Sequence, residues 1–185
     1  MVNNTVQEEA YRMEKENKIA EKYSEIMDLL GICQTDDNTD TPIRVAKSLM
    51  EMTSSLDWKA ERDLKRKCTT FENKSHGTEI EVKDIEYASM CSHHHLPFFG
   101  KVDITYVAND KILGLSKFDR VVRHFSRRPQ VQEDFTMDIL NFLGELLDPI
   151  YLKVTVKDST HSCMCARGVH SQAKTTTSLE FGKRP

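Results

Sequence analysis

The first quarter of the chain carries apolar residues at helical spacing. Over residues 6–30 these apolar positions alternate with charges of both signs, which is typical of an amphipathic helix. The polar stretch over residues 34–40 predicts a loop. Thr41 followed by Pro42 then has the form of an N-cap with proline at the first helical position, and this predicts a second helix over residues 41–56.

The middle of the chain changes to an alternation of polar and apolar side chains, which is typical of half-buried strands. Residues 57–76 are highly charged and fit neither period, but the alternation is evident over residues 79–88 and again over 101–107. The dipeptide Asn109-Asp110 supplies a turn before the apolar segment 112–115. These features predict a β-hairpin.

Two helices and two strands complete the pattern. Ser116 can cap a helix over residues 116–127, and a second helix over 129–147 opens on its proline. Alternating segments at about 150–158 and 174–182 predict two final strands. The order of elements predicts an α+β fold, with an antiparallel sheet and helices on one face.

Composition and charge narrow the class of protein. The chain has 185 residues, of which 38% are hydrophobic and 30% charged, so it can form a core and remain soluble. No apolar run approaches the roughly 20 residues that cross a bilayer, and the charged N-terminus lacks the apolar centre of a signal peptide. The net charge of −3 is unusual for a nucleic-acid binder. We therefore expect a cytoplasmic protein that binds neither membranes nor nucleic acid.

The cysteines favour metal binding or catalysis over disulfide formation. There are five, which is an odd number and too sparse for a disulfide framework. Two segments about 70 residues apart combine cysteine with histidine: Cys91-Ser-His93-His94-His95 and His161-Ser-Cys163-Met-Cys165. Zinc prefers thiolate sulfur and imidazole nitrogen as ligands in tetrahedral sites.

The spacing within each segment is compatible with one metal site. Residues two apart in an extended segment point to the same side, so His161 and Cys163 can face one cavity. Cys91 and His94 can share a metal if the chain bends between them. Buried cysteines and a surface histidine tract are the ordinary alternatives. The spare histidines favour a catalytic over a structural site, because imidazoles can move protons.

Four separated motifs make the family resemblance specific. They are Cys91-Ser-His-His94, Gly114-Leu-Ser-Lys117, Arg128-Pro-Gln-Val-Gln-Glu133 and His161-Ser-Cys163-Met-Cys-Ala-Arg167-Gly168. Together with the helix start Thr41-Pro-Ile-Arg44, their order and spacing resemble the GTP cyclohydrolase I family over about residues 20–182. Several motifs in register are far stronger evidence than any one of them.

This resemblance implies a zinc-dependent enzyme acting on GTP. The zinc ligands would be Cys91, His94 and Cys163, with a bound water that attacks C8 of guanine. His93 and His161 would transfer protons. Opening of the imidazole ring would release formate, and rearrangement would give 7,8-dihydroneopterin triphosphate, at the start of tetrahydrofolate, other pterin or deazaguanine biosynthesis.

The resemblance also implies the contacts to GTP. Glu133 would accept hydrogen bonds from N1–H and the 2-amino group of guanine, a pair of donors that adenine lacks. Gln132 would shape the same pocket. The triphosphate would be bound by Ser116, Lys117, Arg120, Arg167 and Arg44. For Arg123 and Arg127 we expect only a solvated helix face.

The fold implied is the tunnelling fold, a four-stranded antiparallel sheet with two helices on one face. It would occupy residues 61–185, after an N-terminal helical region over 1–60. Subunits would join edge to edge into a homo-oligomer, usually pentameric rings stacked in pairs as a decamer, since ring closure satisfies the open sheet edges.

Three residues depart from the family pattern. Ser92 stands where glutamate is common, His95 stands where an apolar residue is common, and Cys165 is an additional thiol. Two other functions therefore stay open. One is a non-catalytic or divergent tunnelling-fold protein that binds a purine or pterin. The other is a tunnelling-fold enzyme that reduces or condenses such a compound, although the two-cysteine pattern argues against it.

Overall fold

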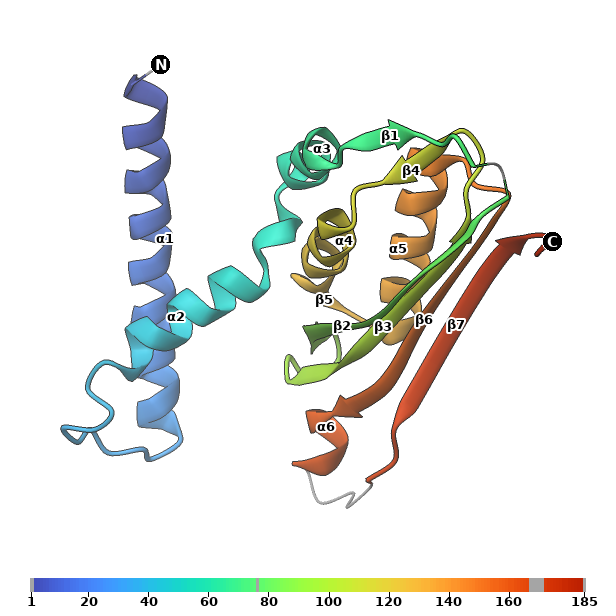
Figure 1. Ribbon diagram of the computed structural model, residues 1–185. Helices are drawn as coiled ribbons and strands as arrows, with labels where there is room; N and C mark the ends of the chain where they lie inside the picture. Colours follow the sequence, from blue (N-terminus) through green and yellow to red (C-terminus); the bar gives the residue numbers. More distant parts are fainter. Residues whose placement is uncertain (1, 76, 167–171, 185) are drawn as a thin grey trace. The chain divides into compact units, whose positions relative to one another are not determined.

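The computed structural model describes residues 2–75, 77–166 and 172–184. The chain divides into two compact units, Met1–Thr53 and Ser54–Pro185 (Figure 1). The boundary expected from the sequence, between residues 60 and 61, falls inside helix α3 (Trp58–Lys67). Within the described residues, no helix combines the length and the apolar composition that a bilayer crossing requires.

The first unit contains the two helices that the periodicity predicts, α1 (Val2–Leu29) and α2 (Thr41–Met52). The start of α2 differs by one residue from the prediction, because Asp40 and not Thr41 is the N-cap. The reason is that the Asp40 carbonyl already accepts a helical hydrogen bond from the Arg44 N–H, at 3.0 Å. The helix also ends earlier than expected, and a 3₁₀ turn, η1 (Ser54–Leu56), begins the second unit.

The second unit is built on one antiparallel sheet whose four long strands follow the order β2-β3-β6-β7. Their bounds are β2 Glu79–Cys91, β3 Pro97–Val107, β6 Tyr151–His161 and β7 Thr175–Gly182. A fifth strand, β5 (Pro129–Gln130), adds a two-residue parallel pairing beside β2. The predicted four-stranded antiparallel sheet is confirmed.

Two helices cover one face of this sheet, α4 (Ser116–Ser126) and α5 (Gln132–Leu147) (Figure 1). Their apolar sides pack on the inward positions of the strands in one continuous core. Fully buried members of that core include Phe118, Val121, Phe135, Ile139, Ile104 and Val154. The α+β class and the tunnelling-fold architecture follow from this arrangement.

The predicted hairpin is wrong. Strand β4 (Lys111–Leu113) pairs with β1 (Thr70–Glu72), in a separate two-stranded sheet. Strand β3 pairs with β2 on one side and with β6 on the other. Because both edges of β3 are occupied, the chain that returns after the turn has no free edge to join there.

Both expected helix starts in this unit are also displaced. Ser116 is the first residue of α4 and does not cap it, since the N-cap is Leu115. Pro129 lies in β5, whose pairing with β2 delays the start of α5 until Gln132. Helix α3, which no pattern predicted, has an identifiable cap: the Asp57 side chain accepts a hydrogen bond from the Lys59 N–H at 2.9 Å.

Candidate active site

A tight turn after β2 brings a cysteine and a histidine together. Cys91 is the last residue of the strand and is 7% exposed. Its N–H donates to the Leu96 carbonyl, and its carbonyl accepts from the His95 N–H, both at 2.9 Å. His95 adopts a left-handed φ of 53° at this turn. The reversal places His94 beside the end of its own strand, as a shared ligand site requires.

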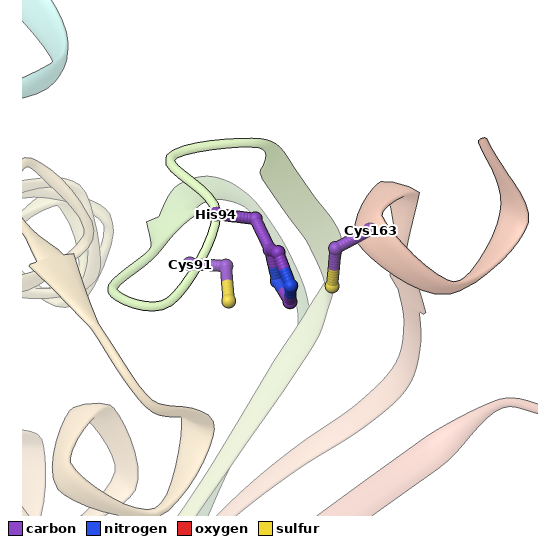
Figure 2. A group of neighbouring side chains, drawn as sticks. All are labelled: Cys91, His94 and Cys163. Carbon is purple, nitrogen blue, oxygen red and sulfur yellow. The ribbon is translucent and has the colours of Figure 1, made fainter. Parts of the chain in front are cut away.

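The third member of the group comes from the end of β6. The extended segment that we expected to contain Cys163 ends at His161, and the chain then forms a single helical turn, α6 (Ser162–Cys165). The ligand atoms of Cys91, His94 and Cys163 nevertheless lie within 4.8 Å of one another. Figure 2 shows these three side chains converging from the β2 turn and from α6.

The chemistry of this group fits a metal ion. Burial, together with the neighbouring Cys91, raises the pKa of the Cys163 thiol. A bound cation would offset that effect, since thiols coordinate metals as thiolates. Two sulfurs and one imidazole are also a known ligand set of catalytic zinc sites, in which the fourth position remains open. The three residues could therefore hold a metal ion.

His161, at the end of β6, is held beside the group by two contacts. Its ring stacks on the fully buried Phe98, with centroids 4.8 Å apart and planes inclined by 1°. Its Nε2 lies 2.9 Å from Oε1 of Gln132. An amide oxygen only accepts hydrogen bonds, so Nε2 is the donor and Nδ1 of the neutral ring is left as an acceptor. Burial lowers the pKa of His161, and the Glu133 carboxylate opposes that shift.

Gln132 is the first residue of α5, and its side chain is fully engaged by the protein. It is 4% exposed. Its Nε2 donates to the Val156 carbonyl at 3.3 Å and to Thr177 Oγ1 at 3.1 Å, while its Oε1 also accepts from Thr175 Oγ1 at 2.7 Å. The structure therefore gives Gln132 a positioning contact with His161. Its contact with guanine stays a prediction.

The second histidine that we expected to transfer protons is more open. His93 is exposed in the turn after β2, and its Nδ1 lies 3.7 Å from the Cys91 sulfur. Glu133, the predicted guanine ligand, is exposed in the first turn of α5. Its carboxylate lies near enough to affect the pKa of His161. His93 thus lies beside the group that could hold a metal, and Glu133 lies near His161.

The predicted phosphate ligands are only partly brought together. Ser116, Lys117 and Arg120 share the first turns of α4. Burial raises the pKa of the Cys68 thiol, and the positive charges of Lys117 and Arg120 both lower it, so these two charges lie near the same thiol. Arg44 belongs to the first unit and forms an ion pair with Asp40, at 3.3 Å. Arg167 lies outside the described residues.

Sequence reasoning missed two residues that position His161: Phe98 stacks on its ring, and Thr175 donates to the Gln132 oxygen that also accepts from His161. Phe98 occupies an ordinary inward position of β3, and Thr175 occupies one of β7. Neither residue belongs to the quoted motifs, and each acts through a contact that only the folded sheet creates. No local signal in the sequence distinguishes them from other strand residues.

Comparison with known proteins gives a consistent result. The sequence pattern of the family described as GTP cyclohydrolase I matches residues 19–184. The GTP cyclohydrolase 1 of Vibrio cholerae is 41% identical over 172 residues, covering 91% of this chain and 77% of the relative. The GTP cyclohydrolase 1 of Parabacteroides distasonis is 38% identical over 164 residues, covering 88% and 82%.

A solved structure is also similar. The apo form of the archaeosine synthase QueF-Like matches with a TM-score of 0.49 and 21% identity, and covers 60% of this chain. The family match, in contrast, extends over nearly the whole chain and is accompanied by relatives at about 40% identity. The chain belongs to the GTP cyclohydrolase I family.

Proposed function

We propose that this protein is a zinc-dependent GTP cyclohydrolase I. It opens the imidazole ring of guanine in GTP at C8, releases formate and forms 7,8-dihydroneopterin triphosphate. The observation that carries the proposal is the convergence of Cys91, His94 and Cys163 beside His161, in a chain that belongs to this family.

Cys91, His94 and Cys163 would hold the zinc ion. When bound, zinc supplies a water molecule acidic enough to lose its proton near neutral pH. Hydration of the purine also needs a proton delivered to the ring nitrogen. His161 is suited to relay this proton, because Gln132 accepts from its Nε2–H and leaves Nδ1 as an acceptor that can take the proton released by the attacking water and pass it to the ring nitrogen. His93, on the Cys91 side of the group, is the second candidate for proton transfer.

Recognition of GTP would depend on α4 and α5. Glu133, at the start of α5, would accept two hydrogen bonds from the guanine edge. Ser116, Lys117 and Arg120, at the start of α4, would bind the triphosphate together with Arg167 and Arg44. The N-terminal turn of α4 would add backbone N–H groups to this anion site.

The assembly we propose is a cytoplasmic homo-oligomer of pentameric rings, stacked in pairs. The sheet order supports ring closure, since β7 ends one side of the sheet and β2 carries only the two-residue β5 on the other. Strand edges of this kind pair readily with another chain. The N-terminal helical region over residues 1–60 would precede the catalytic domain over 61–185.

The test is an incubation of metal-analysed protein with GTP, in which formate and oxidised pterin fluorescence are followed together. We expect both products, and we expect a chelator to abolish both. Formate without pterin would limit the function to ring opening. Absence of turnover by the zinc-loaded protein would instead favour a purine- or pterin-binding protein.

Three variants assign the roles. Cys163→Ala should lose the metal and at least about 1,000-fold of the activity, because it removes a ligand. Cys165→Ala, an exposed thiol two residues away, is the matched control and should keep both. Glu133→Ala should keep its zinc but lose guanine binding. Full activity of Cys163→Ala without bound zinc would contradict the metal mechanism.

A further inference from the structure

Strands β2 and β6 each contain a β-bulge, whereas β3 runs between them with regular alternation. Along β2, Val82 pairs with Ile104 but Ile85 pairs with Val102, so β2 has one residue more than β3 over this stretch. Between β3 and β6 the register shifts by one residue at Gly100. Between β6 and β7 it shifts by one residue again, on the β6 side. Strand β6 therefore has one residue more than each of its neighbours, β3 and β7, over this stretch.

The bulge in β2 reverses which side chains face the helices. Before the bulge the inward residues are Ile80 and Val82, and after it they are Tyr87, Ser89 and Cys91. Side chains alternate with a period of two along a strand. Without the extra residue, the same strand would turn Cys91 toward the opposite face of the sheet.

The bulge in β6 has the same effect. Val154 and Val156 face the helices before it, and Ser159 and His161 do so after it. In β3, by comparison, the buried side chains from Phe98 to Tyr106 all keep to even-numbered positions, with Val102 and Ile104 between them. Two independent insertions therefore place Cys91 and His161, with the turn that carries Cys163, on one face.

Three charged side chains connect the two bulges across β3, and we name Asp84, Asp103 and Lys157 the bulge lock. The Asp84 N–H donates to Asp103 Oδ1 at 2.9 Å. Nζ of Lys157, which lies in the β6 bulge, is 2.5 Å from Asp103 Oδ2 and 3.3 Å from Asp84 Oδ1. Lys157 thus ties together carboxylates of β2 and β3, and Lys101 of β3 lies 3.3 Å from the same Asp84 oxygen.

The backbone at both bulges is unusual in the same way. Asp84 and Asp158 have left-handed φ angles of 60° and 54°. Aspartate tolerates this region better than most residues. At Gly100, opposite the β6 bulge, a Cβ atom would lie 2.6 Å from the Lys157 carbonyl oxygen. The close approach of the two strands there requires glycine.

The bulge lock differs from the ordinary surface ion pairs of the sheet. The side chains of Lys157 and Asp103 are only 27% and 20% exposed, and that of Asp84, at the rim, is 56% exposed. Lys153, on the same strand and the same outer face, makes a 3.6 Å pair with Glu180 whose partners are 42% and 55% exposed. Exposed pairs of the second kind contribute little. Lys153 therefore offers a matched control for Lys157.

We propose that the bulge lock positions the metal group: it holds the β2 and β6 bulges, and through them Cys91 and His161, in their register. Its residues lie on the outer face, so they act through the strands and touch no ligand. The inference deepens the proposed function, on which it rests for the identity of the metal. It predicts that a change at Asp84, seven residues and about 23 Å along β2 from Cys91, alters metal coordination.

The experiment compares Lys157→Met with Lys153→Met in two measurements. Titration with Co²⁺ reports the coordination geometry through its visible bands, and competition with a chelator gives the affinity for Zn²⁺. We expect Lys157→Met to weaken metal binding about tenfold, a loss typical of supporting-residue changes, and to alter the Co²⁺ bands at a temperature where its circular dichroism is native. The metal affinity of Lys153→Met should stay within about twofold of that of the parent. Unchanged affinity and bands in folded Lys157→Met would overturn the proposal.

A second variant covers the case in which Lys157→Met does not fold. Asp84→Asn keeps a residue that tolerates the left-handed backbone and removes only the charge, so we expect about a threefold loss of metal affinity and no other change. Parent-like affinity in Asp84→Asn would then overturn the proposal.

Failure of the proposed function is distinguishable from failure of this inference. If the parent binds metal but does not turn over GTP, the metal titrations still decide the role of the bulge lock. If the parent binds no metal, the rate at which diamide forms a Cys91–Cys163 disulfide replaces the titration. Lys157→Met, or Asp84→Asn in its place, should slow that reaction relative to Lys153→Met, and an equal rate would overturn the inference.

Discussion

The two halves of the main sheet, one on each side of the bulges, bury different chemistry against the same pair of helices. The half that contains Ile104, Val154 and Val156 is mainly apolar on its inward face, where these three residues are fully buried and the Tyr106 hydroxyl accepts a hydrogen bond from the Leu113 N–H. The half that leads to Cys91 and His161 buries hydroxyl and amide groups at Ser89, Tyr87, Ser159, Gln130 and Gln132. We name these the apolar half and the site half.

The difference shows how one sheet can serve stability and chemistry separately. Burial of apolar surface is non-directional, so the apolar half tolerates small displacements. The site half depends on directed hydrogen bonds, and each described buried side-chain nitrogen or oxygen has a partner. Loss of one partner there leaves another polar group unsatisfied. The apolar half should therefore determine stability, and the site half should determine geometry.

The largest effect is expected from Ile104→Ala, in the apolar half. Ile104 is fully buried in the core beneath the helices. Removal of its buried methyl and methylene groups should lower the free energy of unfolding by about 3 kcal/mol. Urea unfolding measures this loss. Metal affinity and kcat should stay within about twofold at temperatures where the variant is folded, and a large loss of either would show that the two halves are not separable.

Gln132→Leu tests the site half. His161 would lose its hydrogen bond, and the hydroxyl groups of Thr175 and Thr177 would lose a partner. We expect kcat to fall about 100-fold, the scale of a misplaced acid–base group, and the KM for GTP to rise by a smaller factor through the predicted contact of Gln132 with guanine. Steady-state kinetics separate the two constants.

The control for Gln132 is Thr136→Val. Thr136 Oγ1 lies 2.6 Å from Thr177 Oγ1 in the same cluster, but in the described part of the chain the hydrogen bond to His161 comes from Gln132 and not from Thr136. Loss of the Thr136 hydroxyl should lower kcat by less than about threefold. Equal effects of Gln132→Leu and Thr136→Val would mean that the cluster has a general structural role and does not hold His161 specifically.

The same division explains how much could be predicted from the sequence. The alternation of apolar residues located all four long strands, because strand periodicity is a local property. The alternation even changes phase between Val82 and Ile85, which is the position of the β2 bulge. The family resemblance implied the group of Cys91, His94 and Cys163, which the fold brings together.

Tertiary contacts set the rest. The three residues of β4 carry too little pattern to specify a partner, so pairing with β1 instead of β3 could not be derived locally. The stacking of Phe98 on His161 joins positions 63 residues apart. The salt bridge from Lys157 to Asp103 joins β6 to β3. In the sequence, these two charged residues look the same as any other residues on the outer face of the sheet.

The smallest effect, and the one that examines the site half most directly, is expected from Tyr87→Phe. The Tyr87 hydroxyl lies 2.6 Å from Ser159 Oγ, just beyond both bulges. At pH 7 the loss of this buried hydrogen bond should cost about 1 kcal/mol of the free energy of unfolding. Tyr11→Phe, at an exposed position of α1, should cost nothing measurable.

The pH dependence of that loss makes the test specific. Burial raises the pKa of Tyr87 to about 12, whereas an unfolded tyrosine ionises near pH 10. The folded state therefore keeps a proton that the unfolded state has lost, and the contribution of Tyr87, complete below about pH 10, declines as the pH rises toward 12. At pH 11 the parent should have lost about 1.4 kcal/mol that Tyr87→Phe cannot lose. The two proteins should then be nearly equal in stability, whereas a constant gap from pH 7 to pH 11 would show that the Tyr87 hydroxyl is exposed to solvent and that the site half is not a closed polar core.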